Sequence, residues 1–171
     1  FLWLVLFSIA SLWACTASII CSSSFSLFIF MTLSAIGYGS FIGVIIMEMD
    51  ENDGMTGLKA ATLTTAAMFI LVFVSGINFA NLFFVSIIVS LILILIIWEL
   101  SVLVRGISRG VQKIKAVVAI IIFSLSLLAS ISMVNVSSDQ GLNDWNTAID
   151  LAFSIYLDII NLILRFLEAM G

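Results

Sequence analysis

The last apolar segment of the chain reads NTAIDLAFSIYLDIINLILRFLEAM (146–170). Ile, Leu, Phe and Ala fill most of its positions, and its polar residues recur at steps of three and four. These residues are Thr147, Asp150, Ser154, Asp158, Asn161, Arg165 and Glu168. Because an α-helix has 3.6 residues per turn, this spacing places all seven on one helical face. The segment is also long enough to cross a bilayer, which takes about 20 apolar residues.

The composition of the whole chain agrees with a membrane location for this segment. Of the 171 residues, 63% are apolar and 9% are charged, and the mean hydropathy is +1.33. Soluble domains are roughly 45–50% apolar and about 25% charged. The values therefore exclude an ordinary soluble enzyme, a nucleic-acid-binding protein and a disordered chain. The class that remains is a polytopic membrane protein.

The chain divides into six apolar segments of near-bilayer length. They lack the alternation of polar and apolar residues that a membrane β-strand would show, so helices are expected. We predict an all-α helix bundle that forms a single transmembrane domain over residues 1–171, with no separate soluble domain. The predicted spans are about 1–22, 25–47, 60–77, 81–104, 116–136 and 146–170.

Basic residues indicate the orientation of the bundle. Outside the last span, every Lys and Arg lies in loops 48–59 and 105–115, which six spans would put on one side together with both termini. The positive-inside rule places that side in the cytoplasm. Loop 48–59 also holds four acidic residues, but acidic residues count little in this rule.

Asp158 is the residue of the last span that points most directly to a function. It follows Asn146 by twelve residues, which is roughly 18 Å along a helix and near the bilayer centre. An ionisable group there costs on the order of 3 kcal/mol unless it is paired or hydrated, so it must face the bundle interior or water. We interpret it as part of an ion or proton pathway. The alternatives are a buried polar contact that only fixes packing, and a helix lying flat on the membrane.

The predicted ion pathway follows the polar face of the last span and includes one residue from the span before it. Asn135 is the strong polar group near the end of that span, and its amide can donate to or accept from Asp158. An ordinary helix cap is the other interpretation of Asn135. The predicted pathway comprises Asp158, Asn135, Asn161, Asp150, Ser154 and Arg165, with Asp158 as the candidate calcium ligand.

Small residues in the second span predict close helix packing. Ala35, Gly39 and Gly43 are spaced by four, and small residues at that spacing let two helix backbones approach each other. The alternative interpretation is a lined cavity to which Tyr38 supplies a hydroxyl group.

Patterns typical of enzymes and of cofactor sites are absent from the sequence. The chain has no His, and Cys15 and Cys21 lie six apart in one apolar run, which is not the spacing of a metal or disulfide pair. No Gly-rich phosphate loop follows a strand, and Gly37-Tyr38-Gly39 lies inside a continuous apolar span instead of a filter loop. We expect a non-enzymatic protein with no resident cofactor and no nucleic-acid partner. Its expected partners are the lipid bilayer and other membrane proteins.

The last span resembles the terminal helix of the Bax inhibitor family. That family's pattern is roughly Leu-Tyr-Leu-Asp, then Ile or Phe, then Ile-Asn-Leu-Phe, and the matching residues here are SIYLDIINLIL (154–164), with Gly171 as the final Gly. Residues 34–47, the acidic loop and residues 60–68 are similar to the family's Gly-rich third and Thr-rich fourth helices. The similarity covers most of the chain, and the specific match is confined to the last span.

The resemblance implies a seven-helix bundle with the last helix at its centre, so the six spans would correspond to helices two to seven. It also implies a pH-sensitive calcium leak controlled by two facing aspartates, one of which corresponds to Asp158. The second aspartate belongs at the end of the penultimate helix, where this sequence departs from the pattern and has Asn135. In the family's arrangement, loop 105–115 would lie on the non-cytoplasmic side.

Three functions are compatible with these observations. The preferred one is a divergent cation leak channel of the Bax inhibitor type, with the cation path along the last helix. The alternatives are a non-catalytic structural subunit of a larger membrane complex, and a proton-coupled carrier that uses Asp158. The expected location is the bacterial inner membrane or, in a eukaryote, the endoplasmic reticulum or the mitochondrial inner membrane.

Overall fold

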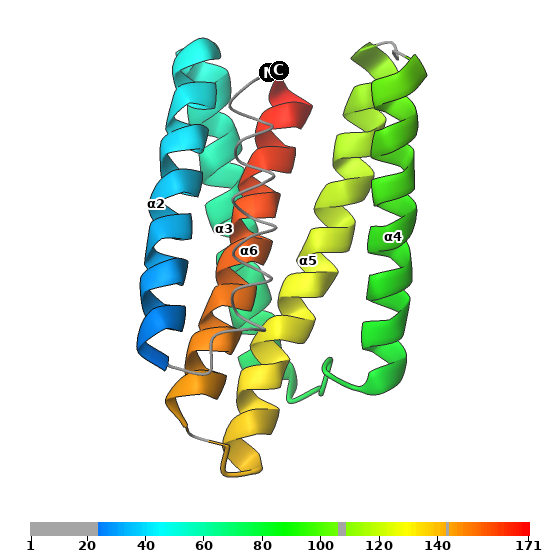
Figure 1. Ribbon diagram of the computed structural model, residues 1–171. Coiled ribbons are helices and arrows are strands. Elements are labelled where there is room, and N and C mark those ends of the chain that lie inside the picture. The colour runs from blue at the N-terminus through cyan, green and yellow to red at the C-terminus, as the bar shows by residue number, and fades with distance from the viewer. Residues whose placement is uncertain (1–23, 106–108, 143) are drawn as a thin grey trace.

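The computed structural model describes residues 24–105, 109–142 and 144–171, and these form an all-α bundle (Figure 1). The described residues contain five helices and not the six that were predicted. The first predicted span, residues 1–22, lies outside the described part of the chain. The helices are α2 (Ser24–Glu48), α3 (Glu51–Ser75), α4 (Leu82–Arg105), α5 (Arg109–Asp139) and α6 (Trp145–Met170).

All five helices are long and apolar enough to cross a membrane. The shortest, α4, has 24 residues, and the longest, α5, has 31. At a rise of about 1.5 Å per residue, each exceeds the roughly 30 Å hydrocarbon core of a bilayer. The all-α class predicted from the sequence is therefore confirmed, and each described helix overlaps one predicted span.

The helix α3 begins nine residues before the start predicted for its span. Residues 51–59 were expected in a loop, but Asp50 caps the helix by accepting a hydrogen bond from the backbone N–H of Asn52 at 3.0 Å. Glu51 and Asp53 lie in the first turn, where negative charge interacts favourably with the helix dipole. The acidic residues that appeared to form a loop therefore stabilise a helix start.

The helix α5 is likewise longer than its predicted span of 116–136. It begins at Arg109 and ends at Asp139, so most of the basic residues assigned to loop 105–115 are helical. One of them, Lys115, is buried. The predicted basic loop is thus mainly the first two turns of a helix, whose charged residues contact neighbouring helices as well as solvent.

The start of α6 is fixed by Asp144. Its carboxylate accepts hydrogen bonds from the backbone N–H of Thr147 at 3.2 Å and from the Thr147 hydroxyl at 2.7 Å. The bond from the Thr147 hydroxyl is the main reason that the pKa of Asp144 lies below its ordinary 3.8. A carboxyl group with a lowered pKa stabilises the fold at pH values above its ordinary pKa. This cap is therefore present at neutral pH, and it is lost as the pH falls below about 3.8.

Consecutive helices run in opposite directions, and α6 lies between α2 and α5 (Figure 1). It packs against α2, α3 and α5, while α4 packs against α5. The end of α2, the start of α3, the end of α4, the start of α5 and the end of α6 lie at one end of the bundle, here called the C-terminal end (Figure 1). The described residues of segments 48–59 and 105–115 lie at one end, as predicted.

The core of the bundle lies mainly between α5 and α6. Leu127 and Ile131 of α5 and Leu162 and Leu167 of α6 are almost completely buried. A second cluster joins α2 and α6 around Ile42, Ile160 and Leu167. These contacts hold α6 in a fixed rotation, and that rotation decides which of its polar residues face α5.

Close approach of two helices occurs at Gly57 of α3, where the sequence did not predict it. A methyl group added to Gly57 would lie 3.0 Å from Cδ2 of Leu167 and 3.5 Å from the Leu167 backbone nitrogen, so α3 and α6 meet there with little room. Gly39 and Gly43, predicted to pack against a neighbour, have open space beside them. Ala35 does lie at a helix contact, because its carbonyl accepts a hydrogen bond from the Tyr156 hydroxyl at 3.1 Å.

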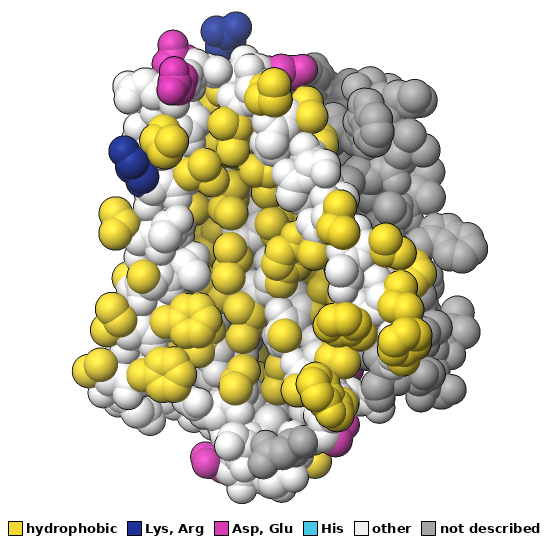
Figure 2. All heavy atoms as spheres, turned by 90° about the vertical axis from the view of Figure 1, so that its left-hand side faces the viewer, with side chains coloured by type: hydrophobic (Ala, Val, Ile, Leu, Met, Phe, Trp, Pro, Cys, Tyr) yellow, Lys and Arg dark blue, Asp and Glu magenta, His cyan; other side chains and the backbone are white. Residues whose placement is uncertain are grey.

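The outer surface of the bundle is strongly apolar. On the face shown in Figure 2, hydrophobic side chains cover the middle, and the charged side chains gather toward the two ends. On α4, the side chains of Leu93, Ile94 and Ile97 are between 56% and 67% exposed. Apolar surface of this extent is suited to contact with lipid chains, which agrees with the length and composition of the helices.

Candidate functional site

The carboxylate of Asp158 is buried in the interior of the bundle. It is 8% exposed, and it lies near the middle of α6, about 18–20 Å from either end of the helix. The predictions that Asp158 is deep and faces the bundle interior agree with this placement. In a spanning helix, such a position is close to the centre of the bilayer.

Two serines of α5 hold the carboxylate. The Ser126 hydroxyl donates to Oδ1 at 2.8 Å, and the Ser130 hydroxyl donates to Oδ2 at 2.6 Å. The two serines are four residues apart and so lie on the same face of α5. The Ser130 oxygen also lies 3.2 Å from the Ser154 hydroxyl of α6. Asp158, Ser126, Ser130 and Ser154 are hereafter called the central polar site.

The partner predicted for Asp158 is therefore corrected. Asn135 is exposed, and the carboxylate is bound by Ser126 and Ser130 instead. Asn135 follows Ser130 by five residues, which turns it about 140° around the helix from the face that contains Ser130. An amide at that position is directed away from the side of α5 that meets Asp158.

The sequence contained a signal for the true partners, namely the Ser-x-x-x-Ser spacing at 126 and 130. That signal is weak, because a serine in an apolar helix usually donates to a backbone carbonyl of its own helix. Ser124, two residues before Ser126, does so and donates to Ile120 at 2.8 Å. Only the packing of α5 on α6 distinguishes the serines that bind Asp158 from those that do not.

The other predicted pathway residues of α6 occupy different environments. Ser154 is exposed and belongs to the central polar site through its contact with Ser130. Asp150 is exposed one turn farther from the centre. Asn161 donates to the carbonyl of Leu157 in its own helix at 2.9 Å. The structure thus brings together Asp158 and Ser154, whereas the amide of Asn161 is used within α6.

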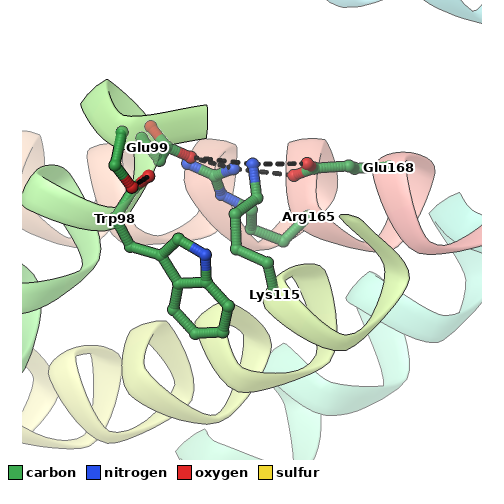
Figure 3. Close-up of polar contacts among 6 residues, drawn as sticks. Trp98, Glu99, Lys115, Arg165 and Glu168 are labelled. Atoms are coloured by element: carbon green, nitrogen blue, oxygen red, sulfur yellow. Dashed lines mark hydrogen bonds and ion pairs between the residues drawn. The ribbon is translucent and has the colours of Figure 1, made fainter. Parts of the chain in front are cut away.

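Arg165, the last predicted pathway residue, belongs to a separate cluster of four charges near the C-terminal end (Figure 3). It contacts Glu99 of α4 at 2.5 Å and Glu168 at 2.7 Å. Lys115 of α5 contacts Glu168 at 2.7 Å and Glu99 at 3.5 Å. Figure 3 shows the two basic groups between the two carboxylates. We call Glu99, Lys115, Arg165 and Glu168 the four-charge cluster.

In the four-charge cluster, Glu99 near the end of α4 pairs with basic groups of two other helices. The side chains of Lys115 and Arg165 are only 8% and 16% exposed, and each of the two carboxylates contacts both basic groups. The cluster joins α4, α5 and α6 and has no net charge. Because the three helices are separate in the sequence, the pairing of these charges becomes evident only from the packed structure.

An apolar groove separates α2 from α6 on the side of Tyr156. Its volume is about 380 Å³, and the hydroxyl groups of Thr32 and Tyr156 in its lining donate hydrogen bonds to the backbone carbonyls of Phe28 and Ala35. Phe28, Met31, Trp145 and Phe153 contribute most of its large side chains. The groove has the apolar character of the lipid-facing surface and contributes no charged group to the central polar site.

The described residues offer few ligands for a metal. Within residues 24–105, 109–142 and 144–171, no three His, Cys, Asp or Glu side chains are placed to hold one ion together.

Comparisons with protein-family models, with curated proteins and with solved structures give no match for this chain. The functional conclusion therefore rests on the geometry of the central polar site and of the four-charge cluster.

Proposed function

We propose that this chain is an integral membrane protein that passes cations across the bilayer along the α5–α6 interface, with Asp158 as the main cation-binding group. The observation that carries the proposal is one buried carboxylate, halfway along a long apolar helix, bound by two hydroxyl groups of the neighbouring helix. Polar and ionisable groups at this depth are rare and usually belong to ion or proton paths.

A purely structural role explains the central polar site less well. An ionised group near the bilayer centre costs on the order of 3 kcal/mol. An uncharged Asn or Ser at position 158 would also hydrogen-bond to the α5 serines, without that cost. The presence of a carboxylate is therefore better explained by a need for negative charge. Binding of a cation that crosses the membrane requires such a charge.

The resemblance to the Bax inhibitor family adds a specific activity to this proposal. It supports a leak channel with Asp158 on the path, and it names Ca²⁺ as the ion and pH as the regulator. The family's second aspartate has no counterpart here, and Ser126 and Ser130 occupy the side of α5 that meets Asp158. A gate built on a proton shared between two carboxylates is therefore not part of the proposal.

Cation flux into liposomes that contain only the purified chain tests the proposal. Asp158→Asn keeps the shape of the side chain and removes its charge, so we expect flux to fall by about tenfold or more, which corresponds to a barrier increase of about 1.4 kcal/mol. Asp150→Asn is the matched control, because it removes an exposed carboxylate from the same helix. Equal flux for Asp158→Asn and the parent chain would contradict the proposal.

A role as a non-catalytic subunit of a membrane complex is the second candidate. It is favoured by Gly39 and Gly43, which have open space beside them and could let a helix of another protein approach α2 closely. The liposome experiment separates the two candidates, because a subunit without its partners is expected to pass no ion in its parent form.

A further inference from the structure

We infer that the central polar site binds a singly charged metal cation, with Na⁺ as the probe, and that it discriminates against Ca²⁺. This inference rests on the proposed function and assigns the class of ion. It is carried by the composition of the site, which combines one carboxylate with three serine hydroxyls. The ion inferred here differs from Ca²⁺, which the resemblance to the Bax inhibitor family implies.

The site supplies five oxygen atoms from two helices. Both carboxylate oxygens of Asp158 lie within 2.8 Å of a serine hydroxyl oxygen, and the Ser154 oxygen lies 3.2 Å from that of Ser130. A hydroxyl hydrogen rotates about its C–O bond, so each serine that now donates to Asp158 can turn a lone pair toward a cation instead. Oxygen ligands of this kind suit hard cations such as alkali and alkaline-earth ions.

Charge balance then selects among the hard cations. Asp158 contributes one negative charge, and the three serines contribute none. A singly charged cation makes the site neutral, whereas a doubly charged one leaves a net positive charge in an apolar, low-dielectric region. Calcium sites in proteins normally recruit several carboxylates for this reason. No group of three acidic, His or Cys side chains is gathered for a metal in the described part of the chain.

Neighbouring charges do not change this balance. Arg165 lies two helical turns from Asp158, about 10 Å along α6, and it is already paired with Glu99 and Glu168. Asp150 lies two turns away in the other direction and is exposed. Among the residues that the structure describes, the buried carboxylate therefore remains the one uncompensated charge in the centre of the α5–α6 interface.

The exposed serine marks the side from which a cation reaches Asp158. Ser154 is exposed and lies against Ser130, and Asp150 follows on the same face of α6 one turn nearer the start of the helix. A cation that enters from the end opposite the C-terminal end meets first Asp150, then Ser154 and then Asp158. The four-charge cluster lies farther along α6, between Asp158 and the C-terminal end of the bundle.

The experiment compares ²²Na⁺ and ⁴⁵Ca²⁺ uptake by the full chain in liposomes of neutral phospholipid. We expect Na⁺ uptake to exceed Ca²⁺ uptake by about tenfold or more at equal concentration, and Asp158→Asn to abolish the Na⁺ component. Adding a second carboxylate with Ser130→Asp is expected to shift the Na⁺/Ca²⁺ ratio toward Ca²⁺ by about tenfold. Ser126→Asp provides the same test from the other serine if the first variant does not fold.

A binding measurement distinguishes failure of the site from failure of transport. In detergent, Na⁺ is expected to raise the unfolding temperature of the parent chain relative to choline at the same ionic strength, and to leave Asp158→Asn unchanged. Stabilisation by Na⁺ without uptake would overturn the proposed transport and keep the site. Uptake of Ca²⁺ equal to that of Na⁺ and dependent on Asp158, or uptake of protons alone, would overturn the assignment of the ion. No Na⁺-specific stabilisation and no uptake would overturn both.

Discussion

Replacing Lys115 with Met is expected to lower the free energy of unfolding by about 3 kcal/mol, roughly a 100-fold change in the unfolding equilibrium. Lys115 is 8% exposed at its side chain and contacts both Glu99 and Glu168. Met keeps the apolar stem of the side chain, so the loss reports the charge. Without Lys115, two partly buried carboxylates share Arg165 alone. Titration with a denaturing detergent in mixed micelles measures the effect.

Two further variants make this prediction specific to the four-charge cluster. Lys113→Met removes an exposed Lys from the same helix and should change stability by less than about 0.5 kcal/mol. The double variant Lys115→Met with Glu168→Gln restores a net charge of zero, so it should be more stable than Lys115→Met alone. If Lys115→Met and Lys113→Met had the same small effect, the cluster would not be joining the helices.

Replacing Gly57 with Val is expected to destabilise the bundle by about 2 kcal/mol or more, because overfilling a packed contact commonly costs 1–3 kcal/mol. A single added methyl would already lie 3.0 Å from Cδ2 of Leu167, and the two methyls of Val reach farther toward the α6 backbone. Leu167 is 2% exposed and has little space into which to move. The same detergent titration measures this loss.

Gly39→Val is the matched control for the packing prediction. Both glycines are helical, so the change in helix propensity is similar at the two positions, but a side chain at Gly39 meets open space. We expect Gly39→Val to be within about 0.5 kcal/mol of the parent chain. If Gly39→Val were as destabilising as Gly57→Val, the contact between Gly57 and Leu167 would not be the cause of the loss.

The helices themselves and the depth of Asp158 could be predicted from the sequence alone. Long apolar segments with few charges form helices in a bilayer, because backbone N–H and C=O groups must then bond within the segment. The rise of about 1.5 Å per residue places Asp158 near the middle of its span. These properties depend on residues close together in the chain, so a correct prediction needs no knowledge of neighbouring helices.

The helix ends were less predictable. Hydropathy detects the apolar part of a helix and stops where charged residues begin, so the polar first turns of α3 and α5 were assigned to loops. Asp50 and its hydrogen bond to the N–H of Asn52 fix the true start of α3. Lys115 remains within α5 because it finds carboxylate partners on α4 and α6. Capping and ion pairing extend these helices beyond their apolar segments.

Only the tertiary structure decided which side chains meet across helices. Asp158 is bound by Ser126 and Ser130 and not by Asn135 because of the rotation of α5 against α6. Residues a few positions apart along a helix can lie on different faces, so a different rotation would present a different side chain. Hydropathy varies little around α5, so it carries little information about the rotation of that helix, although the polar face of α6 is evident from its sequence. Rotation is set instead by shape, at contacts such as Gly57 with Leu167, and by the pairing of Glu99 and Lys115 with Arg165 and Glu168. Such contacts exist only when helices distant in sequence pack together.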